Sequence, residues 1–403
     1  MSIRRSALAA LTMLSLAACT ATQTTSTSTS SAPGGTSEVS TSPATGGASD
    51  SSAPPMTCAQ QTAAGLSPAQ KAAQLVLVAM TPSTIGTAGA QITEGNAAGV
   101  FLLGGWAGID TAAKATEQIH QLSADTAGIG TWVAIDQEGG QVQQLTGSNV
   151  AEIPAAVTQG GMNPQDLQAE AKIWAASLVD AGADINLAPV ADVVPADVGS
   201  KNAPIGLYGR QYGSTPETVT GPMIAFMKGM QEAGVIPTVK HFPGIGRILG
   251  NTDTTASGIS DAVTTADDPA LQPFQAAIDA GAPIIMVSTA LYPNLDPHNK
   301  AAFSSPIITD LLRAQLGFGG VVVSDDLGAA ASVADVPTGE RLTRFVEAGG
   351  DVVLTAEPAQ AATMNAAAVQ KYGAEPAFAA KVDAAVERVL TLKDEHDLLP
   401  CST

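Results

Sequence analysis

Short runs of almost purely apolar residues recur along the chain, and each is followed by a Gly, Pro or Asp turn. Apolar side chains at every position, rather than at alternate ones, are typical of strands covered on both faces of a sheet. Between the runs lie longer Ala-rich segments. Eight such strands are predicted, at residues 74–78, 99–103, 131–135, 185–190, 236–240, 284–288, 320–324 and 351–355.

The segments between the runs have the spacing of amphipathic helices. One starts at Pro164, preceded by the capping residue Asn163, which is a typical helix beginning. Eight strand–helix alternations favour an α/β fold of the (β/α)8 TIM-barrel type, in a single domain, over an open doubly wound sheet. No Gly-x-Gly-x-x-Gly opens a helix in the first unit, which disfavours a dinucleotide site. Helices are predicted at 164–181, 216–232, 269–280, 306–315 and 340–347.

The N-terminus has the pattern of a secretory signal. Arg4 and Arg5 precede an apolar stretch that is too short to span a bilayer, and Leu16-Ala-Ala-Cys19 follows. This ending resembles a bacterial lipobox, which implies cleavage after residue 18 and lipidation of Cys19. The alternative is an ordinary signal peptide, residues 1–18, followed by an incidental cysteine.

Residues 20–57 are dominated by Ser, Thr, Gly, Ala and Pro. Such a composition cannot bury enough apolar surface to offset its ordering entropy, so 19–57 is predicted to be a lipidated, disordered tether. The barrel domain is then 58–403. The predicted location is extracytoplasmic, anchored to the cell membrane as a lipoprotein.

Only Cys58 and Cys401 remain after Cys19, and they bracket the predicted barrel. In an oxidising compartment this placement favours a disulfide that joins the two ends of the domain. The alternative is a pair of free thiols.

The chain is acidic, with a formal charge of −19. Loss of Arg4 and Arg5 with the signal makes the mature chain more negative still. This charge argues against nucleic acid as a partner and against an electrostatic surface for anionic lipid. Contact with the membrane is expected through the lipid anchor alone, and the oligomeric state is left open.

Polar side chains follow several of the predicted strands. In barrels of this type, chemistry collects at the carboxyl ends of the strands. Any one acid there is commonly a helix cap, but several acids together with Arg, Lys and His fit sugar recognition and glycoside chemistry. A metal is disfavoured because His241 is the only strand-end histidine, and no cofactor is implied. The polar groups are Asp136-Gln-Glu138, Asn186, Asp192, Arg210, Lys240-His241, Ser288-Thr289 and Ser324-Asp325-Asp326.

Several of these segments, in order, resemble the signatures of glycoside hydrolase family 3, and in particular its single-domain bacterial β-N-acetylglucosaminidases. The resemblance extends over nearly the whole predicted barrel. It is carried by residues 135–140, 186–192, 208–210, 240–244, 292–293, 303–304, 323–327, 348–351 and 388–393.

The resemblance implies retention of configuration through a glycosyl-enzyme intermediate. Asp325 matches the nucleophile, and Asp136, Arg210, Lys240 and His241 match residues that bind sugar hydroxyls. Lys240 and Arg210 are also expected to help keep Asp325 ionised, since nearby positive charge lowers the pKa of a carboxyl group.

The sequence departs from this family pattern at the proton donor. The branch carries an Asp-x-His dyad in the loop after Lys240-His241, whereas this chain has Asp253-Thr254-Thr255. A threonine hydroxyl has too high a pKa for acid/base work near neutrality. Other departures are Ile245 and Thr289, where the branch often has histidine, and Gln141 and Gln144, where it often has arginine.

Three functions remain open. The first is a retaining exo-glycosidase that releases terminal β-linked N-acetylglucosamine from cell-wall glycans or muropeptides, with Asp253 as acid/base, or His298 as a weaker candidate. The second is a phosphorylase, in which phosphate attacks the intermediate. The third is a degenerate site that binds carbohydrate without turnover. We adopt the first interpretation.

Overall fold

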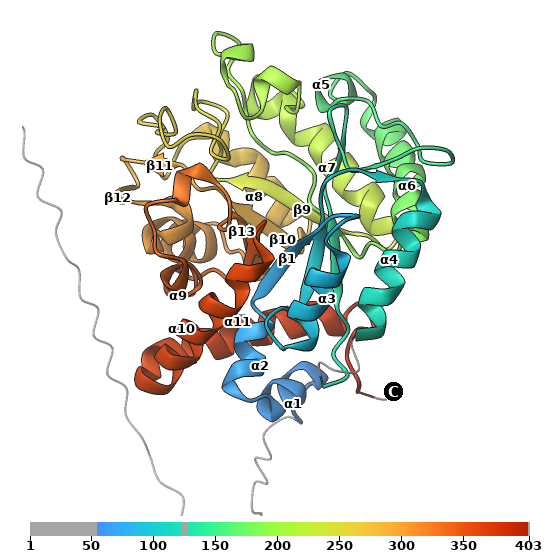
Figure 1. Cartoon of the computed structure of the whole chain (residues 1–403). Coiled ribbons are helices and arrows are strands. Elements are labelled where there is room, and N and C mark those ends of the chain that lie inside the picture. The colour runs from blue at the N-terminus through green and yellow to red at the C-terminus, as the bar shows by residue number, and fades with distance from the viewer. Residues whose placement is uncertain (1–54, 123–126, 402–403) are drawn as a thin grey trace, which may run out of the picture. The chain divides into compact units, whose positions relative to one another are not determined.

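The computed structural model of the protein describes residues 55–122 and 127–401. The predicted signal peptide, Cys19 and most of the predicted tether lie outside this range. Eight parallel strands form a closed barrel with helices around it (Figure 1). In spatial order the strands are β1 (Val76–Met80), β14 (Val352–Thr355), β13 (Val321–Asp326), β10 (Ile284–Val287), β9 (Ile236–Phe242), β8 (Ile185–Asn186), β4 (Trp132–Ile135) and β2 (Gly99–Leu102).

The predicted TIM-type barrel is confirmed, and each of the eight predicted runs overlaps a barrel strand. The largest difference is at β8, which was predicted to continue to residue 190 but ends at Asn186. Pro189 follows, and its ring nitrogen cannot donate a ladder hydrogen bond. Pairing resumes as a single bridge between Val190 and Lys240, so this stretch still lies against β9.

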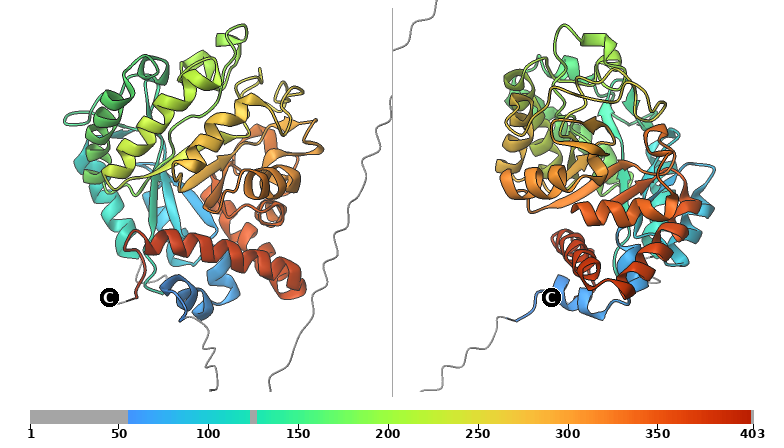
Figure 2. Two further views of the ribbon diagram at one scale, coloured as in Figure 1. Left: turned by 180° about the vertical axis from the view of Figure 1, so that it is seen from behind. Right: turned by 90° about the vertical axis from the view of Figure 1, so that its left-hand side faces the viewer.

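The helices lie on the outside of the barrel (Figure 2). α7 occupies the predicted range, and Thr215 forms a capping box at its start. The principal helices are α1 (Cys58–Gly65), α2 (Pro68–Ala73), α3 (Ile85–Thr93), α4 (Ile109–Gln121), α5 (Ala156–Gln159), α6 (Pro164–Asp180), α7 (Pro216–Glu232), α8 (Gln272–Asp279), η6 (Pro306–Gln315), α9 (Thr338–Ala348), α10 (Ala361–Ala374) and α11 (Pro376–Asp394).

Three small two-stranded sheets are built from the loops rather than from the barrel. They are β3 (Trp106–Ala107) with β7 (Leu145–Thr146), β5 (Gln137–Gly139) with β6 (Val142–Gln143), and β11 (Leu291–Tyr292) with β12 (Asp296–Lys300). All three follow carboxyl ends of barrel strands. They stiffen the loops that carry the polar strand-end residues.

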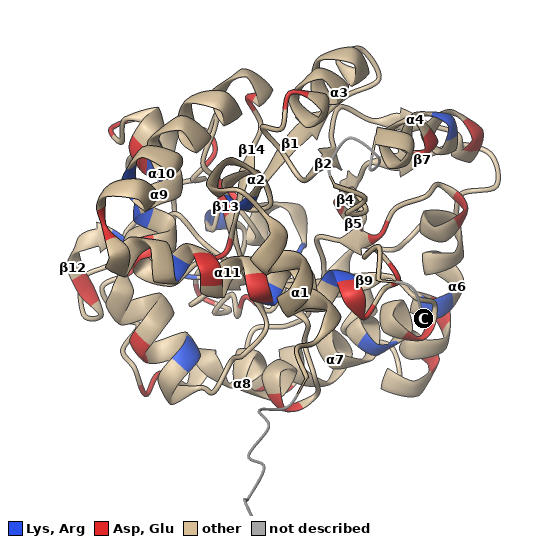
Figure 3. Ribbon diagram, turned by 90° about the horizontal axis from the view of Figure 1, so that it is seen from below, with Lys and Arg blue, Asp and Glu red and all other residues tan. Residues whose placement is uncertain are grey.

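The opposite, N-terminal end of the barrel is closed by α11, which crosses it beside α1 and α2 (Figure 3). At this end Asp351, fully buried at the start of β14, binds Arg388 of α11 (2.8 Å) and Arg313 of η6 (2.7 Å). The motif residues 348–351 and 388–393 therefore hold the closed end together. Residues at this end of a barrel usually serve stability rather than chemistry.

Lys393 of α11 is fully buried at the same end. Its Nζ donates to Gln74 Oε1 (3.0 Å) and to the carbonyl of Gly130 (2.7 Å), and it lies 4.9 Å from the centre of the Trp132 ring. Burial lowers the pKa of Lys393 from 10.5 to about 7, although Asp184 opposes the shift.

We therefore expect Lys393 to make stability depend on pH. Between about pH 7 and 10.5 the unfolded chain holds a proton on this lysine that the folded chain lacks, so the free energy of unfolding rises with pH by up to ~1.4 kcal/mol per unit. Replacing Lys393 by Met removes this contribution. Chemical denaturation of both proteins across this range measures the difference, with Lys381→Met, an exposed lysine of the same helix, as control. Parallel curves for parent and Lys393→Met would contradict the expectation.

A disulfide joins Cys58, at the start of α1, to Cys401 beyond α11, with the two Cα atoms 5.9 Å apart. The first and last helices of the domain are thus linked across a sequence separation of 343 residues. No helix within 55–122 or 127–401 is long and apolar enough to cross a membrane.

Candidate active site

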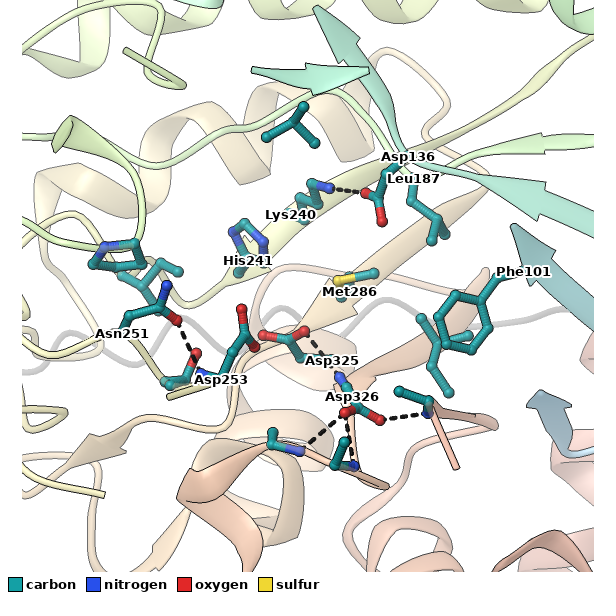
Figure 4. Close-up of a pocket in the computed structure, with 18 of the residues that line it drawn as sticks. Phe101, Asp136, Leu187, Lys240, His241, Asn251, Asp253, Met286, Asp325 and Asp326 are labelled. Carbon is teal, nitrogen blue, oxygen red and sulfur yellow. Dashed lines mark hydrogen bonds and ion pairs between the residues drawn. The ribbon is translucent and has the colours of Figure 1, made fainter. Parts of the chain in front are cut away.

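A pocket of about 360 Å³ opens at the carboxyl ends of the barrel strands (Figure 4). Its polar wall contains all six residues predicted for catalysis and sugar binding, and its apolar wall comes from several strands and loops. The lining residues are Phe101, Leu103, Asp136, Val142, Leu187, Pro204, Arg210, Lys240, His241, Ile245, Asn251, Thr252, Asp253, Met286, Asp325, Asp326, Ala329, Ala330, Leu354 and Ala356.

One side of the pocket is a network of two cations and two carboxylates. Lys240 Nζ lies 2.6 Å from Asp136 Oδ1 and 2.6 Å from Glu138 Oε1. The guanidinium of Arg210 donates two parallel hydrogen bonds to the carboxylate of Glu138, of 2.8 and 2.6 Å. Two parallel bonds fix the guanidinium in plane with the carboxylate, so the network is rigid before any sugar enters.

The charges in this network stabilise one another. Burial disfavours the ionised form of Glu138, but Arg210 and Lys240 outweigh it and lower its pKa to about 2. Burial likewise opposes the charge of Lys240, and Asp136 and Glu138 overcome it and raise its pKa. Glu138 and Lys240 therefore stabilise each other's charged forms in this network.

The chain after β4 is held in place by buried amides. Asn186 of β8 exchanges two hydrogen bonds of 3.1 Å with the backbone of Gln137, and the Gln137 side chain does the same with the backbone of Leu145. Gly139 has a φ of +105°, and a Cβ there would lie 2.4 Å from the Pro154 carbonyl oxygen. The backbone that carries Asp136 and Glu138 is therefore held in one conformation.

Replacing Glu138 by Gln is expected to disturb the whole network. Arg210 and Lys240 would keep their buried charges without this counter-ion, and breaking a buried ion pair from one side costs about 3 kcal/mol or more. We expect a lower melting temperature together with weaker sugar binding, measured by thermal unfolding and calorimetry. Glu152→Gln, an exposed acid on the same loop, is the matched control. Stability and affinity equal to those of the control would rule out this role.

His241 is oriented by an acid that the sequence did not single out for this task. Asp192 is fully buried, and its Oδ2 lies 2.7 Å from His241 Nδ1. Its Oδ1 accepts from the N–H of Ile245 (2.8 Å). Since Asp192 takes the Nδ1 side of the ring, the Nε2 side is left for the pocket.

The loop after β9 is anchored along its length. Asn202 donates to the carbonyls of Ile245 and Ile248, both at 2.7 Å. A Cβ on Gly246 would lie 1.9 Å from the Val193 carbonyl oxygen, so only glycine permits this close approach. At its far end, the carbonyl of Asp253 accepts from the N–H of Ala331 (3.0 Å), in the loop after β13. This contact brings Asp253 to the loop that follows Asp325.

The carboxyl groups of Asp253 and Asp325 point toward each other in the pocket (Figure 4). Desolvation, and next the negative charge of Asp325, raise the pKa of Asp253 to about 6, although His241 and Arg210 act in the opposite direction. The Asp253 residue also reaches solvent at the pocket mouth. We therefore expect the pKa of Asp253 to be raised most when a bound sugar excludes solvent from the pocket mouth.

The two acids at the end of β13 differ in their contacts. Asp325 Oδ1 accepts from the N–H of Asp326 (2.9 Å), which fixes the carboxylate at the pocket wall. Asp326 accepts from four backbone N–H groups, those of Gly328, Ala329, Ala330 and Ala356, at 2.7–2.9 Å. Asp326 therefore shapes the loop, whereas Asp325 faces the cavity.

Lys240 and Arg210 form their ion pairs with Asp136 and Glu138, and their effect on the ionisation of Asp325 stays a prediction. One sequence expectation needs correction. His298 lies exposed on β12 and is absent from the pocket lining given above, which removes it as an acid/base candidate. The hydroxyl of Thr255 accepts from the N–H of Ser257 (2.9 Å) in a local turn.

The positions where histidine was expected have other structural roles. Ile245 is buried against the pocket, and the hydroxyl of Thr289 lies 2.7 Å from that of Ser332. The Gln144 side chain accepts from the N–H of Gly105 (3.1 Å). Across residues 55–122 and 127–401, no three His, Cys, Asp or Glu side chains are arranged to hold a metal ion.

Two residues of the site were present in quoted motifs but were given no role from sequence. Glu138 is the centre of the charge network, and Asp192 orients His241. Both lie in segments that carry the family resemblance, and Glu138 lies two residues beyond Asp136.

Comparison with known proteins places the chain among glycosidases. The sequence profile described as "Glycosyl hydrolase family 3 N terminal domain" matches residues 69–392. A curated β-hexosaminidase from Stenotrophomonas maltophilia (strain K279a) is 35% identical over 233 residues, which cover 56% of this chain and 67% of that protein.

Solved structures agree with this. The crystal structure of a β-N-acetylhexosaminidase from Beutenbergia cavernae DSM 12333 is 46% identical, with a TM-score of 0.80, covering 82% of this chain and 99% of that one. A glycoside hydrolase family 3 β-N-acetylglucosaminidase from Paenibacillus sp. str. FPU-7 is 28% identical, with a TM-score of 0.72, covering 84% of this chain and 65% of that one.

Proposed function

Because the chain belongs to glycoside hydrolase family 3, as a hydrolase of the β-N-acetylhexosaminidase type, we propose that it releases terminal β-linked N-acetylglucosamine with retention of configuration. The observation that carries the mechanism is the facing pair of carboxyl groups, Asp253 and Asp325, of which one has a pKa raised to about 6. Two carboxyl groups whose environments separate their protonation states can divide the roles of acid and nucleophile.

In the first step, the Asp253 carboxylic acid gives its proton to the glycosidic oxygen. The Asp325 carboxylate attacks the anomeric carbon from the α face, the bond from that carbon to the leaving oxygen breaks, and the leaving group departs as a neutral alcohol. The sugar is then held as an ester on Asp325. Asp253 is left ionised and ready to act as a base.

In the second step, Asp253 takes a proton from a water molecule whose oxygen attacks the anomeric carbon from the β face. The ester bond to Asp325 breaks, and β-N-acetylglucosamine leaves. Asp325 is again a carboxylate and Asp253 again a carboxylic acid, so the cycle closes without a cofactor.

Sugar hydroxyls are proposed to bind the opposite wall. Lys240 has one N–H left after its two ion pairs, Asp136 has a second oxygen, and His241 presents Nε2. Because these groups are fixed before binding, they orient the sugar over Asp325 at little entropic cost.

Trapping the intermediate tests this mechanism. Incubation with a 2,4-dinitrophenyl glycoside whose ring fluorine slows ester hydrolysis is expected to release one equivalent of phenol and add one sugar to Asp325, located by peptide mass spectrometry. Asp325→Asn serves as the control and should acquire no adduct. Steady turnover without an adduct would instead favour attack by the substrate's own acetamido oxygen. Binding with neither release nor adduct would leave the degenerate carbohydrate-binding protein, the alternative that Thr255 in place of histidine favours.

We also propose cell-wall fragments as the natural substrate and a lipid anchor on Cys19 as the attachment to the membrane. In support, the described chain starts just before α1, at the closed end of the barrel and opposite the pocket (Figure 1). Release of N-acetylglucosamine from muropeptides tests the substrate. Loss of membrane fractionation in Cys19→Ala tests the anchor, and an unchanged distribution would refute it.

A further inference from the structure

We infer that the pocket selects the leaving group of its substrate by charge, and accepts glycosides whose group beyond the scissile bond is neutral or cationic rather than anionic. This inference rests on the proposed glycosidase activity and narrows its substrate class. Among cell-wall fragments, it favours those in which the muramic carboxyl group is bound in an amide to a peptide over those in which it is free.

The two cations of the pocket, Lys240 and Arg210, already form ion pairs within the protein. Lys240 is paired with Asp136 and Glu138, each at 2.6 Å, and Arg210 is paired with Glu138 through two bonds. The third donor group of Arg210, its NH1, is held by the carbonyl of Pro204 (2.8 Å). No other lysine or arginine lies among the described residues that form the pocket wall.

Other lysines and arginines of the described loops also have hydrogen-bond or ion-pair partners. Arg247 is bound to Asp268 by two bonds of 2.9 Å, and Lys300 is paired with Asp335. Lys201 donates to the carbonyl of Asp197 (3.1 Å) and is not among the lining residues. Where arginines were expected from the family pattern, Gln144 instead accepts a backbone hydrogen bond and carries no charge.

Carboxylates, in contrast, face the cavity. Asp325 and Asp326 line the cavity, whereas the nearby cation Arg341 donates to the carbonyls of Leu327 and Gly328 and is not among the lining residues. Asp253 lines it too, and adds a negative charge only when it is ionised. An anionic leaving group would therefore approach the Asp325 carboxylate, while the lining cations Lys240 and Arg210 are already paired with Asp136 and Glu138. The chain's net charge of −19 adds a longer-range repulsion that salt screens.

Matched leaving groups test the inference. Three aryl β-N-acetylglucosaminides carry a carboxamide, a carboxylate or an aminomethyl group at the same ring position. We expect kcat/KM for the carboxylate to be about tenfold below that for the carboxamide at low salt, and the gap to close at high salt. The ammonium substrate should match or exceed the carboxamide and lose its advantage with salt. Equal values with no salt dependence would overturn the inference.

A positive charge introduced at the pocket mouth should raise the activity on the carboxylate substrate relative to the carboxamide. Ala329 is exposed and lines the pocket, and its contact with Asp326 is through its backbone N–H (2.8 Å), which any side chain retains. In Ala329→Arg the carboxylate-to-carboxamide ratio of kcat/KM is expected to rise about tenfold relative to Ala329→Gln. Comparing the ratio across variants cancels differences in leaving-group reactivity. An identical ratio in the two variants would contradict the proposal.

Failure of the charge rule can be distinguished from failure of the proposed function. If the parent protein hydrolyses none of the three glycosides, the glycosidase proposal fails, and calorimetry with the same compounds on the parent measures their affinities directly. Weaker binding of the carboxylate, relieved by salt, would support the charge rule without catalysis. Equal affinities would overturn it.

Discussion

Replacing Asp325 by Gly is expected to lower kcat on aryl β-N-acetylglucosaminides by on the order of 10⁴-fold or more, because the covalent intermediate can no longer form. The vacated space lies on the α face of the sugar, where a small anion fits. Added azide should therefore restore turnover and give the α-glycosyl azide, since its attack inverts the β-linked substrate once. Rate measurements with activated substrates and NMR of the product check both expectations.

Asp326→Gly is the control for this prediction. Asp326 accepts four backbone N–H bonds, so its loss should lower the melting temperature, while azide should yield no α-azide product. If Asp326→Gly instead produced the α-azide and Asp325→Gly kept parental turnover, the nucleophile would have to be reassigned to Asp326.

The barrel could be predicted from sequence because its strands are buried on both faces, so each reads as an apolar run that ends at a polar residue. β9 shows this well, since the apolar stretch from Ile236 leads directly to Lys240 and His241. The predicted strand boundaries were wrong where a single residue ends a strand inside an apolar run. Pro189 interrupts the run after Asn186 without a change in hydrophobicity, and the ladder ends there.

The partners within the site could not be predicted in the same way. Periodicity says which residues reach a strand end, but it does not say which charges meet across the barrel. Lys240 is bound to Asp136 and Glu138, both of which follow β4, and the sequence had not indicated Glu138 as its partner. The contact of Asp253 with the loop after β13 depends on one backbone hydrogen bond, from the N–H of Ala331, which the sequence pattern does not reveal.

The acid/base prediction concerns Asp253. With its pKa raised to about 6, this carboxyl group is protonated, and able to act as an acid, below that pH and ionised above it. We expect kcat/KM for a substrate with a poor leaving group to fall above about pH 6. Asp253 and Asp325 interact, so the observed limb belongs to the pair rather than to one residue. Asp253→Asn should abolish this limb and lower kcat/KM by roughly 10²–10⁴-fold.

The dependence on the leaving group and the anomer of the azide product distinguish the acid/base role of Asp253 from the nucleophile role of Asp325. A 2,4-dinitrophenyl leaving group needs no proton, so Asp253→Asn should still form the Asp325 ester quickly and then hydrolyse it slowly, giving a burst. Azide should relieve the slow step from the β face and give the β-glycosyl azide, the opposite anomer to that expected from Asp325→Gly. Thr255→Ala is the matched control in the same loop, because its hydroxyl only accepts from Ser257 N–H. Turnover and a pH profile in Asp253→Asn like those of the control would show that another group supplies the proton.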